Sequence, residues 1–237
     1  MTGATYEIPI MIVGDSISHG SSGHWTWRYR LWRHLRAHDV RLDLVGPKTG
    51  LDNVDPDGTT YADPDFDTYL AEKDAIEAKV AEHRPEYLLV LLGINDLLWH
   101  PVEPPRFEAD LREFVANARR ADPRLRIVVG RILPTRKAGD EPEFAARVAA
   151  SNDRIEAVAA DLNTDEAPLV VARTDAEFVA AEHTWDGTHP NPAGEYRIAA
   201  AFADILAAAF GLGAHYPRPF PRIADTPTAA NSNTPTD

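Results

Sequence analysis

Short apolar runs, rich in β-branched residues, alternate along this chain with longer segments in which apolar residues recur at helical spacing. The runs have the length of buried strands, and we predict strands at 8–13, 41–45, 87–92, 126–133 and 169–172. Helical spacing predicts a helix after the first strand, and further helices at 106–121, 143–161 and 193–210. Such alternation is typical of an α/β domain with a parallel sheet covered by helices on both faces.

Two segments break this alternation. Residues 46–67 are rich in Asp, Pro and Gly, which predicts a long loop, and loops of that length are often functional. Beyond residue 214 the chain is punctuated by proline, and its last dozen residues offer almost nothing to bury. We therefore predict a single domain over residues 1–214, followed by a Pro-rich, largely disordered tail over residues 215–237.

Composition narrows the functional classes. The formal net charge of −13 argues against a nucleic-acid partner and favours a small-molecule substrate. The absence of cysteine excludes disulfides, thiolate nucleophiles and zinc–thiolate sites. Neither a signal peptide nor an apolar run of the about 20 residues that span a bilayer is visible. We expect a cytoplasmic protein without a membrane partner, or a secreted one if the sequence is a trimmed mature form; nothing in it indicates an oligomeric state.

Three polar segments carry the candidate chemistry. Gly-Asp-Ser at 14–16 follows the first predicted strand, and Gly-Ile-Asn-Asp at 93–96 follows the third. Asp-Gly-Thr-His at 186–189 precedes the last predicted helix. Because the carboxyl ends of parallel strands meet at one edge of a sheet, we expect these segments to converge there.

The residue types in these segments suit acyl transfer through a serine nucleophile. A serine hydroxyl needs an adjacent base, and His189 is the candidate base for Ser16. Asp186 lies close enough in sequence to hold the imidazole in one tautomer. The amide of Asn95 and the backbone N–H of Ser16 are candidate donors to the oxyanion. Taken alone, Ser16 would be interpreted as a helix cap; the combination favours catalysis.

In their order and context the three segments resemble those of the SGNH (GDSL-like) hydrolase superfamily, up to about residue 210, and most closely its bacterial branch of small carbohydrate esterases. The resemblance implies a flavodoxin-like three-layer α/β/α sandwich with a five-stranded parallel sheet in the order 2-1-3-4-5. It implies a Ser16, Asp186 and His189 triad with Asn95 as an oxyanion donor. The implied function is a serine esterase or deacetylase that hydrolyses a small O-acyl ester and needs no metal or organic cofactor.

One family feature is missing. The family's second motif provides a glycine whose N–H is a further oxyanion donor, yet no glycine lies between Gly58 and Gly93. Gly58 is one candidate for this role if its loop folds back. The backbone of Asp74 or Ala75 is another, although the Asp74 carboxylate would then oppose the oxyanion. Two alternatives therefore remain: an acyltransferase or cyclising tailoring enzyme that uses the same triad, and a non-catalytic SGNH-fold binding protein.

Four further residues are candidates for substrate contacts: Asp15, His19, Arg131 and Trp185. Asp15 also has a structural interpretation, the ordering of the turn that carries Ser16. Arg131 stands in an otherwise apolar strand, so pairing with Asp96 or another acid is the alternative to binding a substrate carboxylate.

Overall fold

A five-stranded parallel sheet forms the centre of the protein. The computed structural model describes residues 6–19, 26–49, 62–63, 69–99 and 102–221. Every strand pair in the sheet is parallel, and the strand order is β2-β1-β5-β6-β7. The predicted order 2-1-3-4-5 is therefore confirmed. The strands are β1 (Ile8–Gly14), β2 (Leu42–Val45), β5 (Tyr87–Leu91), β6 (Arg126–Gly130) and β7 (Leu169–Ala172).

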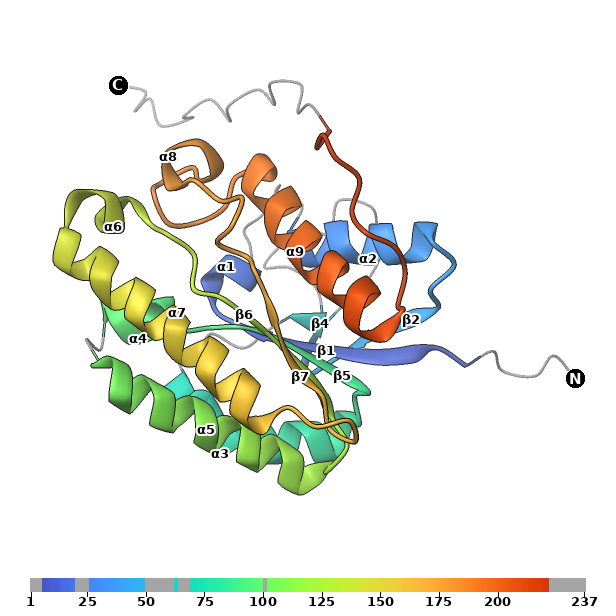
Figure 1. Ribbon diagram of the computed structural model, residues 1–237. Coiled ribbons are helices and arrows are strands. Elements are labelled where there is room, and N and C mark those ends of the chain that lie inside the picture. The colour runs from blue at the N-terminus through green and yellow to red at the C-terminus, as the bar shows by residue number, and fades with distance from the viewer. Residues whose placement is uncertain (1–5, 20–25, 50–61, 64–68, 100–101, 222–237) are drawn as a thin grey trace, which may run out of the picture.

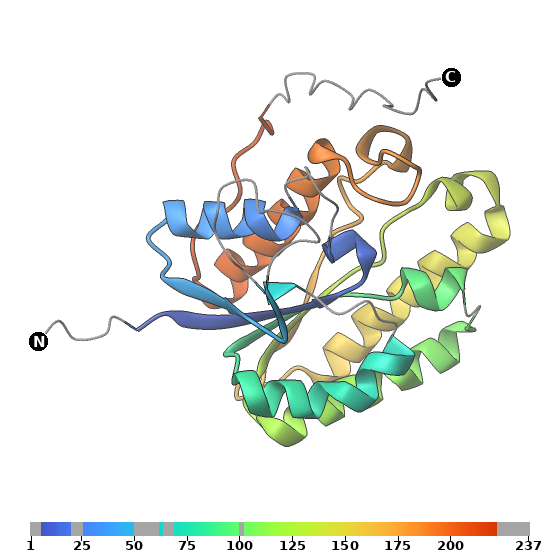
Figure 2. The ribbon, with the colours of Figure 1, turned by 180° about the vertical axis from the view of Figure 1, so that it is seen from behind.

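Helices cover both faces of this sheet, which makes the three layers of an α/β/α sandwich. One face carries two helices that contact each other, α2 (Trp27–Ala37) and α9 (Pro192–Phe210), as Figures 1 and 2 show. The other face carries α3 (Tyr69–His83), α5 (Pro104–Ala121) and α7 (Pro142–Leu162) (Figure 1). All five residues of β5, the central strand, are buried because neighbours flank it within the sheet and helices cover it above and below.

The register of the sheet brings the predicted site segments together. Gly14 at the end of β1 lies opposite Leu91 at the end of β5. The short helix α1 (Ser16–His19) begins two residues after Gly14, and α4 (Ile94–Leu98) begins three residues after Leu91. Both helices thus start at the same edge of the sheet, where ligands bind in open α/β folds.

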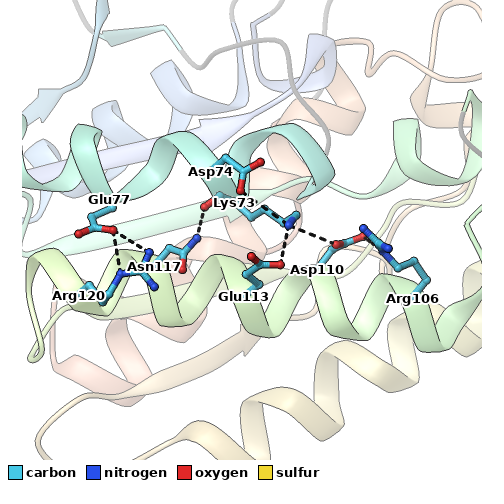
Figure 3. A network of polar contacts seen from close by, with 8 residues as sticks. All are labelled: Lys73, Asp74, Glu77, Arg106, Asp110, Glu113, Asn117 and Arg120. Atoms are coloured by element: carbon cyan, nitrogen blue, oxygen red, sulfur yellow. Dashed lines mark hydrogen bonds and ion pairs between the residues drawn. The ribbon is translucent and has the colours of Figure 1, made fainter.

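The helix α3 lies in a segment for which no element was predicted. It buries only a few apolar side chains, among them Ile76 and Val80, and it also makes polar contacts with α5. Lys73 Nζ lies 2.5 Å from a carboxylate oxygen of Glu113, and Asn117 donates to the carbonyl of Lys73 (Figure 3). The ion pair between Glu77 and Arg120 extends the same network (Figure 3).

The predicted loop and tail are described only in part. Within 46–67, Lys48–Thr49 (β3) and Ala62–Asp63 (β4) form a two-residue antiparallel pair, and 50–61 and 64–68 lie outside the described residues. Residues 215–221, the first part of the predicted tail, pack against the helices through Tyr216, which is 8% exposed and stacks on His34. Residues 222–237 lie outside the described residues. In the described part of the chain, no helix has the length and apolarity needed to cross a bilayer.

The helix that begins with Ser16 is fixed from beneath by α2. Arg28, which is fully buried, donates from Nε to the carbonyl of Ser18 at 2.6 Å and from Nη2 to that of His19 at 3.1 Å. The indole of Trp27 donates to Ser18 Oγ at 3.1 Å. Any side chain at Gly14 would collide with Ser18, so a glycine is needed for α1 to turn back this closely over the end of β1.

We predict that Arg28→Ala lowers the free energy of unfolding by about 2–4 kcal/mol, because two buried carbonyls lose their charged donor. Urea unfolding measures the change. Arg36→Ala on the same helix is the matched control. Arg36 is exposed, and its side chain has only weak contacts, an ion pair with the exposed Glu7 at 3.4 Å and a guanidinium 5.8 Å from the Trp32 ring; the cost of this substitution is expected below about 0.5 kcal/mol. Equal losses for the two variants would show that Arg28 does not anchor α1.

Candidate active site

Ser16, His189 and Asp186 form a continuous chain of hydrogen bonds. The distance from His189 Nε2 to Ser16 Oγ is 2.9 Å, and that from His189 Nδ1 to Asp186 Oδ2 is 2.6 Å. A carboxylate only accepts, so Nδ1 carries the proton of the neutral imidazole and Nε2 is left to accept the serine proton. The segments predicted to converge therefore meet, across 173 positions of sequence, in the arrangement of a nucleophile, a base and an orienting acid.

The loop that carries His189 is shaped by its own polar groups. Asp186 Oδ1 accepts the backbone N–H groups of Thr188 at 2.9 Å and His189 at 2.7 Å. The hydroxyl of Thr184 accepts the N–H of Gly187 at 2.9 Å, and Trp185 N–H donates to the carbonyl of His189 at 3.1 Å. Thr184 was not among the predicted residues, because no spacing rule marks a hydroxyl that orders a loop.

The electrostatics of this loop favour an ionised Asp186. Partial burial by itself would raise the pKa of Asp186, but hydrogen bonds from the His189 ring and from two backbone N–H groups lower that pKa below its usual value. The carboxylate can therefore stabilise an imidazolium on His189. The His189 side chain is 32% exposed, so a substrate can reach it. Trp185 stacks on the His189 ring at 5.5 Å between centroids and is itself 57% exposed.

Asn95 reaches the same edge of the sheet from the first turn of α4. Gly93 caps that helix with a φ of +112°, a left-handed conformation that a side chain would strain. The side chain of Asn95 is partly exposed, and its Oδ1 accepts a hydrogen bond from Trp99 at 3.2 Å. The N–H of Ser16 has no acceptor within α1 because Ser16 is the first residue of that helix. Both predicted oxyanion donors thus follow neighbouring strands, β5 and β1.

Asp15 and His19, two of the predicted candidates for substrate contacts, are buried beside the turn that carries Ser16. Asp15 is 1% exposed, and its Oδ1 accepts the N–H of Ile17 at 3.0 Å. Its backbone carbonyl accepts from the N–H groups of Ser18 and His19 at 2.9 Å, so Asp15 orders the turn that carries Ser16. Its Oδ2 has no hydrogen-bond partner among the described residues, and burial, reinforced by the nearby charge of Asp96, raises its pKa to about 7. His19 is 5% exposed at the end of α1.

Arg131 is likewise occupied by structural partners. Its Nε lies 2.9 Å from Asp175 Oδ2 and its Nη1 lies 2.9 Å from Glu156 Oε1. The structural pairing expected for this arginine is therefore present, with these two acids in place of Asp96. Arg131 lies in the wall of a cavity of about 690 Å³ between α7 and the helices α6 (Arg136–Asp140) and α8 (Ala180–His183), a hollow that sequence patterns did not indicate.

The further oxyanion donor is not found at Ala75. This residue lies well inside α3, where its N–H is directed along the helix toward the carbonyl four residues earlier. Asp74 is exposed on the same helix, 3.8 Å from Lys73 Nζ (Figure 3). Gly58, the other candidate, lies outside the described residues. Within the described part of the chain, no cluster of three or more histidine, aspartate or glutamate side chains is placed to hold a metal ion.

The raised pKa of Asp15 generates a prediction about stability. Its folded-state pKa of about 7 lies above the ordinary value of 3.8, so the folded protein retains a proton that the unfolded chain releases between these values. The free energy of unfolding therefore falls as the pH rises from about 4 to about 7. Asp15→Asn keeps the acceptor for Ile17 and does not titrate, so the variant gains stability relative to wild type over this range.

Urea unfolding at a series of pH values tests this expectation, with Asp153→Asn on the exposed face of α7 as the control. The control should follow wild type throughout. Parallel curves for wild type and Asp15→Asn would show that the Asp15 carboxyl titrates normally in the folded protein.

Comparisons with known proteins identify the family of this chain. The model of the GDSL-like Lipase/Acylhydrolase family matches residues 12–197. A carbohydrate esterase of family 3 from Talaromyces cellulolyticus superposes with a TM-score of 0.72 and 24% identity, covering 85% of this chain and 97% of its own. A family 3 carbohydrate esterase from Clostridium thermocellum superposes with a TM-score of 0.67 and 20% identity, and the match covers 86% of this chain and 99% of that one. A mutant of an acetylxylan esterase from Geobacillus stearothermophilus superposes with a TM-score of 0.59 and 17% identity, and the match covers 82% of this chain and 92% of that one. No curated protein matches the sequence.

At these identities the solved structures show the shared fold, whereas the family match extends over most of the chain and includes Ser16 and His189. The predicted resemblance is confirmed: the chain belongs to the GDSL-like lipase/acylhydrolase family of serine hydrolases.

Proposed function

We propose that this protein is a serine esterase that removes small acyl groups, acetyl groups foremost, from hydroxyl groups of carbohydrates. The observation that carries the proposal is the pair of hydrogen bonds that joins Ser16 to His189 and His189 to Asp186. In this chain a hydroxyl, a ring nitrogen able to accept its proton and a carboxylate of lowered pKa are held together at a partly exposed site.

Acylation begins as Ser16 Oγ attacks the acyl carbonyl while its proton moves to His189 Nε2. Asp186 stabilises the imidazolium that forms. The amide N–H of Asn95 and the backbone N–H of Ser16 donate to the negative oxygen of the tetrahedral intermediate. The bond between the carbonyl carbon and the alcohol oxygen then breaks, and the alcohol leaves with the proton from His189.

Deacylation repeats these steps with water as the nucleophile. His189 takes a proton from water, the hydroxyl adds to the acyl-enzyme carbonyl, and the same donors stabilise the second tetrahedral intermediate. Ser16 leaves with the proton from His189. The sum is one ester and one water converted to one acid and one alcohol, with the enzyme unchanged.

Two tryptophans support a carbohydrate ester as the substrate. Trp185 and Trp99 are among the few large apolar side chains that are exposed in the described residues, and they adjoin His189 and Asn95 respectively. Exposed aromatic faces beside a polar site are suited to the apolar faces of sugar rings. Several structural neighbours are carbohydrate or acetylxylan esterases, and another is an acetyl esterase mutant with an acetate ion.

One test of the proposed function concerns the nucleophile. Ser16→Ala should lower kcat for 4-nitrophenyl acetate and for acetylated xylo-oligosaccharides by about 10⁶-fold, because no other described hydroxyl contacts His189. Release of nitrophenol and of acetate measures the loss. Ser151→Ala is the matched control: Ser151 is buried in α7 and its Oγ has no hydrogen-bond partner among the described residues, so activity should be unchanged.

Product analysis with an added alcohol separates the alternatives. Acetate as the main product supports an esterase, whereas transfer of the acyl group to the alcohol in preference to water would assign an acyltransferase. A folded wild type that cleaves neither substrate and transfers no acyl group would favour a binding protein and contradict the proposal.

Another test of the proposed function concerns the acid. Asp186→Asn should keep the loop, because an amide oxygen still accepts from Thr188 and His189, yet it places His189 in the wrong tautomer. We expect kcat to fall by about 10⁴-fold with little change in KM. Steady-state kinetics measure kcat and KM of this variant, with Asp153→Asn as the control. A variant that retains a tenth of wild-type kcat would remove Asp186 from the triad.

A further inference from the structure

The side chains of Asn95 and Trp99 are joined by a hydrogen bond that the catalytic scheme does not use. Trp99 follows Asn95 by four residues, about one helical turn, and its Nε1 donates to Asn95 Oδ1 at 3.2 Å. Trp99 is the C-cap of α4, and its backbone N–H donates to the carbonyl of Asn95 at 3.0 Å, which closes the last turn of the helix. Residues four apart on a helix lie on the same face, which lets the indole reach the amide.

This contact determines which way the amide of Asn95 is turned. An indole nitrogen can only donate, so the amide atom that faces Trp99 is the oxygen. Because the amide group is planar, its NH₂ group is then directed away from the indole. Without such a partner an asparagine can present either end. For an oxyanion the two orientations are opposites: the NH₂ group stabilises the negative charge and the carbonyl oxygen repels it.

Packing gives no competing reason for a tryptophan at this position. Trp99 is 74% exposed, the highest value among the exposed large apolar side chains in the described part of the chain. It does not belong to the buried hydrophobic core. The ring face remains open to a substrate, while the ring nitrogen is used by Asn95. A phenylalanine would keep most of the face and lose only the donor.

We propose that Trp99 is a positioning residue that holds the Asn95 amide with its N–H directed at the oxyanion. The inference rests on the proposed function, in which Asn95 stabilises the tetrahedral intermediates. It deepens that function by naming a residue that acts through Asn95, at a position where an exposed tryptophan would otherwise be interpreted only as a substrate contact.

A double-mutant cycle tests this role with wild type, Trp99→Phe, Asn95→Ala and the double variant, using 4-nitrophenyl acetate and the rate of labelling by a fluorophosphonate. Trp99→Phe should lower kcat and the labelling rate by about 2- to 10-fold, the value of one hydrogen bond, with KM nearly unchanged. Asn95→Ala should lower kcat by about 10²–10³-fold. In the Asn95→Ala background, Trp99→Phe should have no further effect.

Trp32→Phe is the matched control, since Trp32 lies on α2 and packs against the core, and its kinetics should equal those of wild type. Two results overturn the inference alone: Trp99→Phe with wild-type kcat, or an equal loss with and without Asn95, which would make Trp99 a direct substrate contact. If Ser16→Ala lost its activity while Asn95→Ala kept the kcat of wild type, the inference about Trp99 would also be overturned, but the proposed esterase function would remain. A folded wild type that neither hydrolyses the ester nor reacts with the probe overturns the proposed function, and this inference with it.

Discussion

The carboxyl ends of parallel strands lie at one edge of the sheet, and the candidate site depends on that constraint. Ser16 follows β1, Asn95 follows the neighbouring β5, and His189 belongs to the long connection after β7. None of these residues is near another in sequence. The register that sets Gly14 opposite Leu91 brings the first two turns together, and the loop from Thr184 to Pro190, closed by a bridge between its ends, brings the base to the serine.

Burial of polar groups beneath the site keeps the nucleophile turn in place. Arg28 satisfies carbonyls of α1 from below, and Asp15 satisfies N–H groups at its start. Burial raises the pKa of Asp15 to about 7, so below that pH its carboxyl is mostly neutral and adds little negative charge beneath this turn. The polar groups nearer the surface differ from these buried ones. The lowered pKa of Asp186 favours its ionised form, and His189 and Asn95 are partly exposed, so a substrate can reach them.

Most of the fold could be predicted from the sequence because its strands are short apolar runs and its long helices have clear apolar faces. The meeting of Ser16, Asp186 and His189 could be predicted because each of them lies in a short recognisable segment. The helix α3 could not, since polar contacts with α5 replace part of an apolar face. The roles of Arg28 and Thr184 could not be predicted, because a side chain that forms hydrogen bonds with the backbone leaves no spacing pattern in the sequence. Ala75, one candidate for the further oxyanion donor, lies in the same segment for which no element was predicted, and the structure places its N–H inside α3.

The central claim is that Ser16 is an activated nucleophile, and mass spectrometry of the fluorophosphonate-treated protein tests it most directly. The account predicts a single adduct per chain, located by peptide mapping on Ser16, formed in wild type and absent from a folded Ser16→Ala variant. A folded wild type that stays unlabelled under conditions that modify other serine hydrolases, or an adduct on a different residue, would contradict it.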